Sequence, residues 1–230
     1  MCGRYTLTTG DHGQLAQRFG AMMPSGGGTE RYNVAPTEQA LAVVNGKSGE
    51  REAHLVRWGL VPSYAKDLKG PPMFNARSET VATKAPFKAL VAKPRNRCLI
   101  LADGFYEWLR PEDKKAQRVP FRFTVDGGEP FAFAGLWCWS KPAGEWLASC
   151  TILTCAPNAE VARLHDRMPV ILPGPDAEAA WLSEDLPVED AQALCVPLDA
   201  DRMSAAAANP RVNKSGLEEE GPELLWTSAA

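Results

Sequence analysis

The chain has 230 residues, 45% of them hydrophobic and 23% charged, with a formal net charge of −3. Its apolar runs fall short of the roughly 18 residues that a membrane span needs, and its N-terminus lacks the pattern of a secretory signal. These properties exclude membrane-spanning, collagen-like and wholly disordered proteins. We expect a cytoplasmic protein with a single domain over residues 1–230, in which about 205–230 form a C-terminal tail.

The charges are distributed unevenly along the chain. Residues 57–122 hold 14 basic and 6 acidic side chains, whereas the remainder holds 11 basic and 22 acidic ones. A basic middle inside an acidic chain is compatible with a local site for a polyanion. An unevenly charged solvated surface is the alternative interpretation.

The first half of the chain opens with a helix signal and continues with strand signals. A helix is expected over Asp11–Phe19, because Gly20 is a typical residue just after a helix end. Ala40–Val44 reads as a strand, Asn45-Gly46 as a hairpin turn and Glu52–Arg57 as the returning strand.

The second half continues with strands and ends with helices. Buried strands are expected over Cys98–Leu101 and Thr151–Cys155, and alternating strands over Val119–Val125 and Phe131–Trp139. Short helices are predicted at three places: Asn158–His165, Asp176–Leu182 and Val188–Leu194. This order lacks regular βαβ alternation and indicates an α+β fold.

The six cysteines do not indicate a metal site. None lies in a C-x-x-C pair, and the chain has only three histidines. In a reducing compartment these cysteines remain free thiols. We expect neither a metal nor a cofactor.

Cys2 is the first candidate for chemistry. Removal of Met1 would leave an α-amine and a thiol on one residue. The amine has a pKa of about 7.7–8.0, so part of it is neutral near pH 7 and condenses with an aldehyde to an imine. The thiol then adds to the imine carbon and closes a five-membered thiazolidine. From position alone, an incidental cysteine is the simpler interpretation.

Three clusters combine polar side chains with Gly, Pro or aromatic residues: 74–79, 103–108 and 154–169. Each has an ordinary explanation. Asn75 can shape a turn, Glu107 can pair with Arg77, and His165 can end a helix. Arg167 beside Asp166 can form a surface ion pair. An aldehyde-capturing site needs the same set together: nucleophile, carboxyl group, imidazole, amide and arginines.

Here the sequence resembles the SOS-response-associated peptidase (SRAP) family of abasic-site processing proteins. Seven motifs occur in family order: Cys2-Gly3-Arg4-Tyr5, Arg31–Pro36, Arg57–Pro62, Asn75–Glu79, Ala102–Trp108, His165–Pro169 and Val212-Asn213. The resemblance implies an α+β domain with a largely antiparallel, strongly curved, barrel-like sheet flanked by short helices. It also implies recognition of abasic sites in single-stranded DNA and a thiazolidine cross-link to the ring-opened sugar.

The resemblance assigns roles residue by residue. Cys2 matches the nucleophile, Asn75 the orienting amide, Glu107 the proton shuttle and His165 the group that assists ring opening. Three arginines would grip phosphates: Arg4, Arg77 and Arg167. Bases would contact Pro36, Trp58 and Tyr64. Relatives often carry aromatic residues where this chain has Ser63-Tyr64, so its wedge between bases is smaller.

Several alternatives stay open. The N-terminal cysteine could serve a peptidase or amidohydrolase, the protein could bind single-stranded DNA without catalysis, or the polar clusters could be purely structural. A β-lyase side activity is compatible with an imine intermediate. The resemblance further suggests a monomer, nucleoid-associated when bound to DNA.

Overall fold

The computed structural model describes residues 2–24, 30–109, 117–216 and 218–226. Its centre is a closed, five-stranded mixed barrel. The barrel strands are β4 (Gln39–Asn45), β5 (Arg51–Trp58), β7 (Arg97–Ala102), β10 (Phe131–Ser140) and β11 (Leu147–Cys155). Neighbouring strands are antiparallel except where β11 meets β5 in parallel and closes the barrel. The α+β, barrel-like fold expected from the sequence is confirmed.

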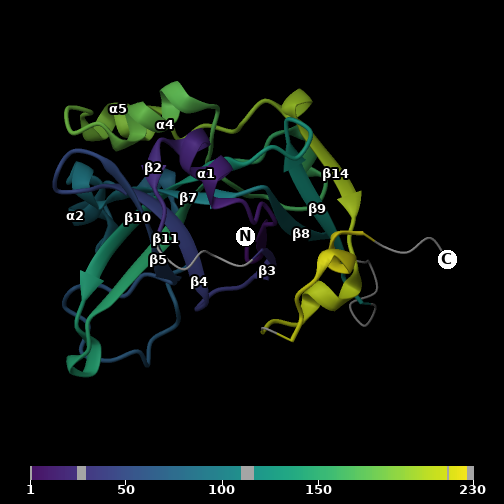
Figure 1. The fold of residues 1–230 in the computed structure, drawn as a ribbon, viewed down its shortest axis with the longest axis horizontal. Helices are drawn as coiled ribbons and strands as arrows, with labels where there is room; N and C mark the ends of the chain where they lie inside the picture. The colour runs from purple at the N-terminus through teal and green to yellow at the C-terminus, as the bar shows by residue number, and fades with distance from the viewer. Residues whose placement is uncertain (1, 25–29, 110–116, 217, 227–230) are drawn as a thin grey trace.

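Short strands extend the barrel sheet. They are β2 (Ala21–Met22), β6 (Asn75–Arg77), β12 (Met168–Pro169) and β13 (Ile171–Leu172). A second sheet has the order β14-β9-β8-β1-β3. Its strands are β1 (Tyr5–Leu7), β3 (Arg31–Val34), β8 (Gly104–Leu109), β9 (Val119–Val125) and β14 (Met203–Ala207). Figure 1 shows this sheet on the right and the barrel on the left, with the N-terminus between them.

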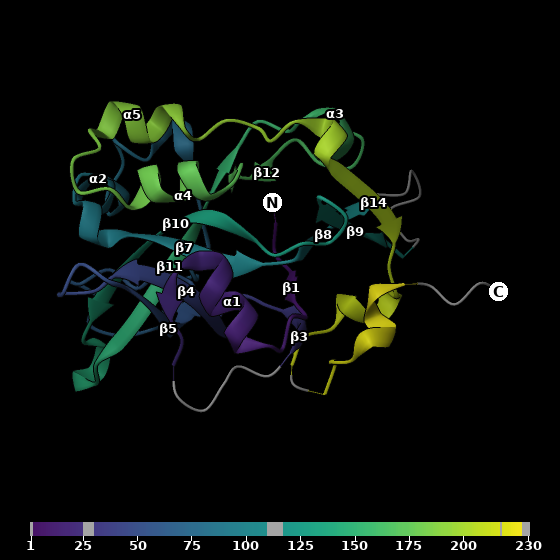
Figure 2. The same cartoon turned by 45° about the horizontal axis from the view of Figure 1, so that its top comes forward.

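The helices are short and lie on the barrel and its edges. They are α1 (His12–Phe19), α2 (Phe87–Val91), α3 (Ala159–Ala162), α4 (Pro175–Leu182) and α5 (Val188–Ala193). Both views show α4 and α5 together over the β7 and β10 side of the barrel (Figures 1 and 2). The side chain of Asp11 accepts from the backbone N–H of Gly13 at 2.7 Å and so caps α1. Gly20 ends α1 in the left-handed conformation, as its sequence predicts.

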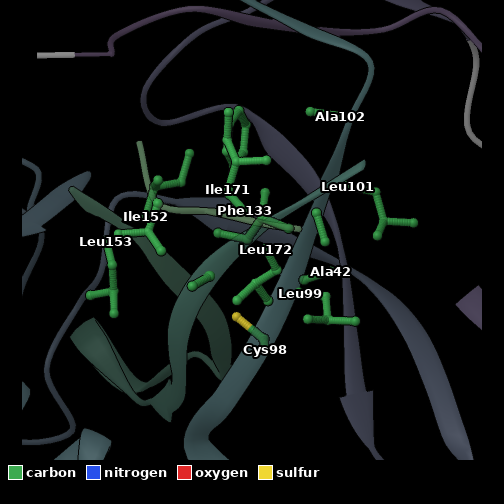
Figure 3. Close-up of a cluster of buried hydrophobic side chains, with 14 of the residues drawn as sticks. Ala42, Cys98, Leu99, Leu101, Ala102, Phe133, Ile152, Leu153, Ile171 and Leu172 are labelled. Atoms are coloured by element: carbon green, nitrogen blue, oxygen red, sulfur yellow. The ribbon is translucent and has the colours of Figure 1, made fainter. Parts of the chain in front are cut away.

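The barrel interior is filled by side chains from several strands. β7 is buried along its whole length, which agrees with the uninterrupted apolar run Cys98–Ala102 that follows the buried Arg97 at its start. Figure 3 shows Leu99, Phe133 and Ile152, from β7, β10 and β11, gathered in one cluster. Gly135 lies opposite Cys98 in this region. A Cβ at that glycine would come within 2.8 Å of the Cys98 sulfur, so close packing requires glycine there.

One turn differs from its prediction. Asn45-Gly46 does not form a two-residue hairpin turn, because β4 ends at Asn45 and β5 begins only at Arg51. Instead, the N–H of Gly46 donates to the Glu50 carbonyl at 2.7 Å, and Gly49 adopts a positive φ of 85°. The chain therefore reverses its direction between β4 and β5 in a longer loop, in which Gly49 adopts the positive φ.

Asp103 joins the two sheets at the corner between β7 and β8. Its buried carboxylate accepts hydrogen bonds from the hydroxyl groups of Thr6 and Thr8 and from the backbone N–H of Thr8. Arg122 of β9 donates to the same carboxylate at 3.1 Å. Because β1 begins three residues after Cys2 and β8 contains Glu107, this network fixes the two segments relative to each other.

Candidate active site

Cys2 lies between the two sheets and has no exposed surface. The segment that follows it is held by β1, which pairs with β3 on one side and β8 on the other. The backbone N–H of Tyr106 donates to the Arg4 carbonyl at 3.0 Å. The Cys2 Sγ donates to the same carbonyl at 3.6 Å. The nucleophile predicted from the sequence is therefore held by its neighbours on β1 and β8.

Asn75 contacts Cys2 directly. Its strand, β6, pairs in parallel with β11 and places Asn75 opposite Ile152. From there the Asn75 Nδ2 donates to the Cys2 carbonyl at 2.8 Å. The Asn75 Oδ1 is buried and accepts no hydrogen bond within the described residues. One half of the amide thus orients Cys2, and the other half is an acceptor available to a ligand.

Glu107 places a buried carboxyl group near the Cys2 thiol. It lies on β8, one residue beyond the Tyr106 that bonds to Arg4, and is 2% exposed. Burial raises the pKa of the Cys2 thiol strongly, and the negative charge of Glu107 raises it further. The thiol is therefore protonated at neutral pH, and its attack on a carbon atom requires a base. Glu107 is close enough to influence that proton.

His165 follows α3 and is held by the backbone beside it. The N–H of Arg167 donates to the His165 Nδ1 at 3.0 Å, and the carboxylate of Asp166 is also 3.0 Å from this nitrogen. A nitrogen that accepts from a backbone N–H carries no proton in the neutral ring. In the neutral tautomer that accepts this N–H at Nδ1, the ring proton is on Nε2, which is then a hydrogen-bond donor.

Glu107 and His165 line a cavity of about 280 Å³ next to the Cys2 segment. It is lined by Gly3, Arg4, Glu107, Trp108, Arg118, His165 and Asn213. The Trp108 Nε1 donates to the Asn213 Oδ1 at 2.7 Å and so joins β8 to the C-terminal segment. The structure thus brings Cys2, Asn75, Glu107 and His165 to one place, although they are up to 163 positions apart.

Apart from Gly3, which has no side chain, three cavity residues were not singled out from the sequence. Trp108 and Asn213 stand inside recognised motifs, so their motif membership could have identified them. Arg118 lies on an exposed stretch just before β9 and has no motif around it. Only the fold shows that Arg118 adds a positive charge to the cavity.

Two of the predicted phosphate-binding arginines border the site. Arg4 donates through Nη1 to the Gly3 carbonyl at 2.8 Å, while its buried Nε has no partner among the described residues. Partial burial lowers the Arg4 pKa from its ordinary value, yet the group stays protonated. Arg77 is exposed on β6, two residues after Asn75. Arg4 thus places a positive charge beside Cys2, and Arg77 places a second one on the strand that carries Asn75.

Arg167 has a different environment from the one expected. Its guanidinium forms two hydrogen bonds with the Glu79 carboxylate, at 2.6 and 2.8 Å, and a third with the Thr154 carbonyl at 2.6 Å. The simple Arg167–Asp166 pair considered above is therefore wrong. Arg167 instead connects the His165 loop to the segment that follows Asn75.

Trp58 does not occupy a position where it could stack on a base. The side chain is fully buried, its Nε1 donates to the Phe74 carbonyl at 2.8 Å, and its ring packs edge-on with Tyr5 at 5.2 Å. The predicted base-contact role of Trp58 is corrected to a packing role, because no face of its ring is accessible. Tyr64 is 70% exposed and Pro36 is half-buried, so both have accessible surface.

The described residues contain neither a metal-ligand cluster nor a membrane-spanning helix. No group of three His, Cys, Asp or Glu residues within that part of the chain could hold a metal ion. None of its helices combines the length and apolar character needed to cross a membrane.

Comparison with known proteins shows similarity along nearly the whole chain. A family model described as SOS response associated peptidase (SRAP) matches residues 1–215. Abasic site processing protein YoqW of Bacillus subtilis (strain 168) is 41% identical over 231 residues, which covers 98% of this chain and 99% of YoqW. Abasic site processing protein YoaM of the same bacterium is 43% identical over 222 residues, 93% of either chain.

A solved structure has the same fold. The crystal structure of a protein from Bacteroides thetaiotaomicron superposes with a TM-score of 0.84 at 22% sequence identity, covering 99% of this chain and 100% of that one. The barrel and the second sheet are therefore common to this chain and the Bacteroides thetaiotaomicron protein.

Proposed function

Because the chain belongs to the SOS response associated peptidase family, we propose that it processes abasic sites in single-stranded DNA by forming a covalent cross-link through Cys2. The observation that supports this most directly is the contact of Asn75 with Cys2 beside the buried Glu107. A generic DNA-binding surface has no need for an oriented N-terminal cysteine next to a buried carboxyl group.

The reaction begins once Met1, which lies outside the described residues, is removed and the α-amine of Cys2 is free. The neutral amine attacks the C1′ aldehyde of the ring-opened sugar, and loss of one water gives an imine. The thiol sulfur then bonds to the imine carbon, and the nitrogen receives a proton. The product is a thiazolidine, formed with the net release of one water molecule.

Asn75 and Glu107 have separate tasks in this sequence. Asn75 holds the Cys2 carbonyl, so the amine and the thiol are presented in a fixed orientation. Glu107 donates a proton to the hydroxyl group that leaves as water, and then accepts the proton of the thiol. The raised pKa of the thiol supports this second task, because the sulfur does not ionise unaided at neutral pH.

His165 acts before the cross-link forms. An abasic sugar is mostly a closed ring, and its C1′–O4′ bond must break to expose the aldehyde. With Nδ1 accepting from the Arg167 backbone, the His165 Nε2–H can donate to O4′ as that bond breaks. The proton of the C1′ hydroxyl passes to a solvent water in the same step, which leaves the open aldehyde and a hydroxyl group at C4′.

The DNA strand is held by charge and by stacking. Arg4, two residues after Cys2, and Arg77, two residues after Asn75, would bind the phosphates beside the lesion. Arg167 would join them only by exchanging a bond to Glu79 for one to a phosphate. The exposed ring of Tyr64 offers a stacking face, and Pro36 a smaller apolar contact.

Intact-mass spectrometry under denaturing conditions tests the proposal. Protein lacking Met1 is incubated with single-stranded DNA that carries one abasic site, beside Cys2→Ala. Wild type is expected to give a stable adduct at the summed mass minus one water. Cys2→Ala keeps its α-amine, so its adduct is expected only when borohydride reduces the imine.

The controls separate the possible failures. Cys138→Ala removes a different buried thiol, which donates to the Val61 carbonyl, and is expected to cross-link like wild type. Wild-type protein with a verified free Cys2 amine that gives no adduct would refute the proposal. Peptide substrates would then become the next class to examine.

A further inference from the structure

A row of exposed positive charges leads away from the site along the segment that follows β6. Between Arg77 and Arg97 the only acidic side chain is Glu79, and it is bound to Arg167. The segment passes through α2 and the short helix η2 (Pro94–Asn96). Its exposed cations, here called the basic track, are Lys84, Lys88, Lys93 and Arg95. In the described part of the chain, none of the four pairs with a carboxylate.

The basic track ends at a group of tryptophans on the β10–β11 hairpin, seen at the lower left of Figure 1. The Nε1 of Trp137 donates to the Arg95 carbonyl at 2.9 Å. The ring centroids of Trp137 and Trp139 are 6.4 Å apart, as are those of Trp139 and Trp146. These three residues are called the tryptophan ladder. Trp139 is 53% and Trp146 68% exposed, and the Lys141 Nζ is 5.5 Å from the Trp146 ring centroid.

Two neighbouring tryptophans with more than half of their surface in water are costly for a protein to display without a ligand. Phosphates are attracted by unpaired lysines and arginines, while bases stack on exposed aromatic rings. The two features meet where Trp137 bonds to Arg95, and their combination fits a single-stranded nucleic acid. It fits a protein partner less well, because four unpaired cations approach the tryptophans without carboxylates between them.

The distance between the Asn75 position and the exposed tryptophans matches the length of a few nucleotides of single-stranded DNA. Along β11, Asn75 is paired with Ile152 and Trp139 with Ala148, while Trp146 directly precedes the strand. At about 3.3 Å per residue, Trp139 and Trp146 lie about 13 and 20 Å along β11 from Ile152, the residue opposite Asn75. With a spacing of about 3.4 Å per stacked nucleotide, that is about four to six nucleotides from the lesion.

We infer that the basic track and the tryptophan ladder bind the single-stranded DNA that flanks the abasic nucleotide, about four to six nucleotides from it. This inference rests on the proposed function for its ligand. The basic track and the tryptophan ladder would increase the affinity for a longer DNA strand and would take no part in the cross-linking reaction. Since stacking is tolerant of base identity, the binding is independent of sequence.

The test compares a trinucleotide with a central abasic site and a 21-mer with a central abasic site. Two variants are used, Trp139→Ala/Trp146→Ala and Lys84→Ala/Lys88→Ala/Lys93→Ala. Trp226→Ala is the matched control, because Trp226 is 51% exposed but follows the C-terminal helix η6 (Pro222–Leu225), on the opposite side of Figure 1. Binding is measured by fluorescence anisotropy and cross-linking by denaturing gels.

Both variants are expected to cross-link the trinucleotide at the wild-type rate. On the 21-mer, the tryptophan variant is expected to bind about ten- to a hundredfold more weakly. The lysine variant should lower the slope of log Kd against log salt by about 2, since each phosphate contact to a single strand contributes about 0.7. The control should match wild type in every assay.

Three results would overturn the inference. One is wild-type affinity of the tryptophan variant for the 21-mer, which would leave the ladder to another occupant such as a protein. Another is an equal loss on the trinucleotide, which would mean that the variants disturb the active site. The third is equal binding of undamaged 3-mer and 21-mer by wild type, a result that stands even if no cross-link forms and the proposed function fails.

Discussion

Replacing Asp103 by Asn tests whether the corner network holds the site together. The Asp103 side chain is 1% exposed and accepts from Thr6, Thr8 and Arg122. Asn has almost the same shape, but its NH₂ group replaces one of the two acceptor oxygens. In either orientation of the amide, this NH₂ group therefore faces hydrogen-bond donors of Thr6, Thr8 or Arg122. Breaking a buried ion pair costs about 3–5 kcal/mol. Since Arg122 is 15% exposed and partly solvated, the lower end, about 3 kcal/mol, is expected.

Urea unfolding at pH 7 measures this change. With a slope of about 2 kcal/mol per molar urea, the midpoint should fall by about 1.5 M. Asp126→Asn is the matched control, because Asp126 also pairs with an arginine, Arg202, but both side chains are about one-third or more exposed. That pair should contribute below about 1 kcal/mol. A loss at Asp103 no larger than at Asp126 would refute the proposed role of the corner.

Three further outcomes follow from the packing of the site. The six buried thiols all have raised pKa values, about 11 at Cys138 and Cys155, so they stay protonated in the folded chain while the unfolded chain ionises near pH 9. The protonated thiols contribute fully to the free energy of unfolding below pH 9, and this contribution is lost above pH 9 at up to about 1.4 kcal/mol per thiol per pH unit. The Tm should therefore fall steeply from pH 9 to 11. A Tm that stays constant over this range would contradict the prediction. Glu79→Gln should slow cross-linking severalfold without weakening DNA binding, because Arg167 would no longer hold the His165 loop. Glu160→Gln is the control, because Glu160 forms an exposed ion pair, and it should change neither the cross-linking rate nor the affinity for DNA. Trp58→Ala should lower the free energy of unfolding by about 3–5 kcal/mol in urea titrations, and a loss of DNA affinity without loss of stability would restore its base-contact role.

Local sequence signals predicted the elements that depend on near neighbours. α1 has its cap at Asp11 and its left-handed stop at Gly20, so both ends are encoded within a few residues. β7, β10 and β11 were recognised because their apolar patterns are long. β6 has only three residues and the barrel closes through parallel pairing of β11 with β5, features that no local pattern carries.

The sequence by itself determined which residue types are available for chemistry: a cysteine behind Met1, an amide at Asn75, a carboxyl group at Glu107 and an imidazole at His165. Only the tertiary structure decided which of the remaining candidates are accessible. Trp58 is enclosed by the core and Arg167 is bound to Glu79, whereas Arg118 enters the cavity. Burial and partner choice arise from contacts between distant segments, and these contacts also set the pKa of the Cys2 thiol. Residue identity is local, while the environment that gives a residue its function is created by folding.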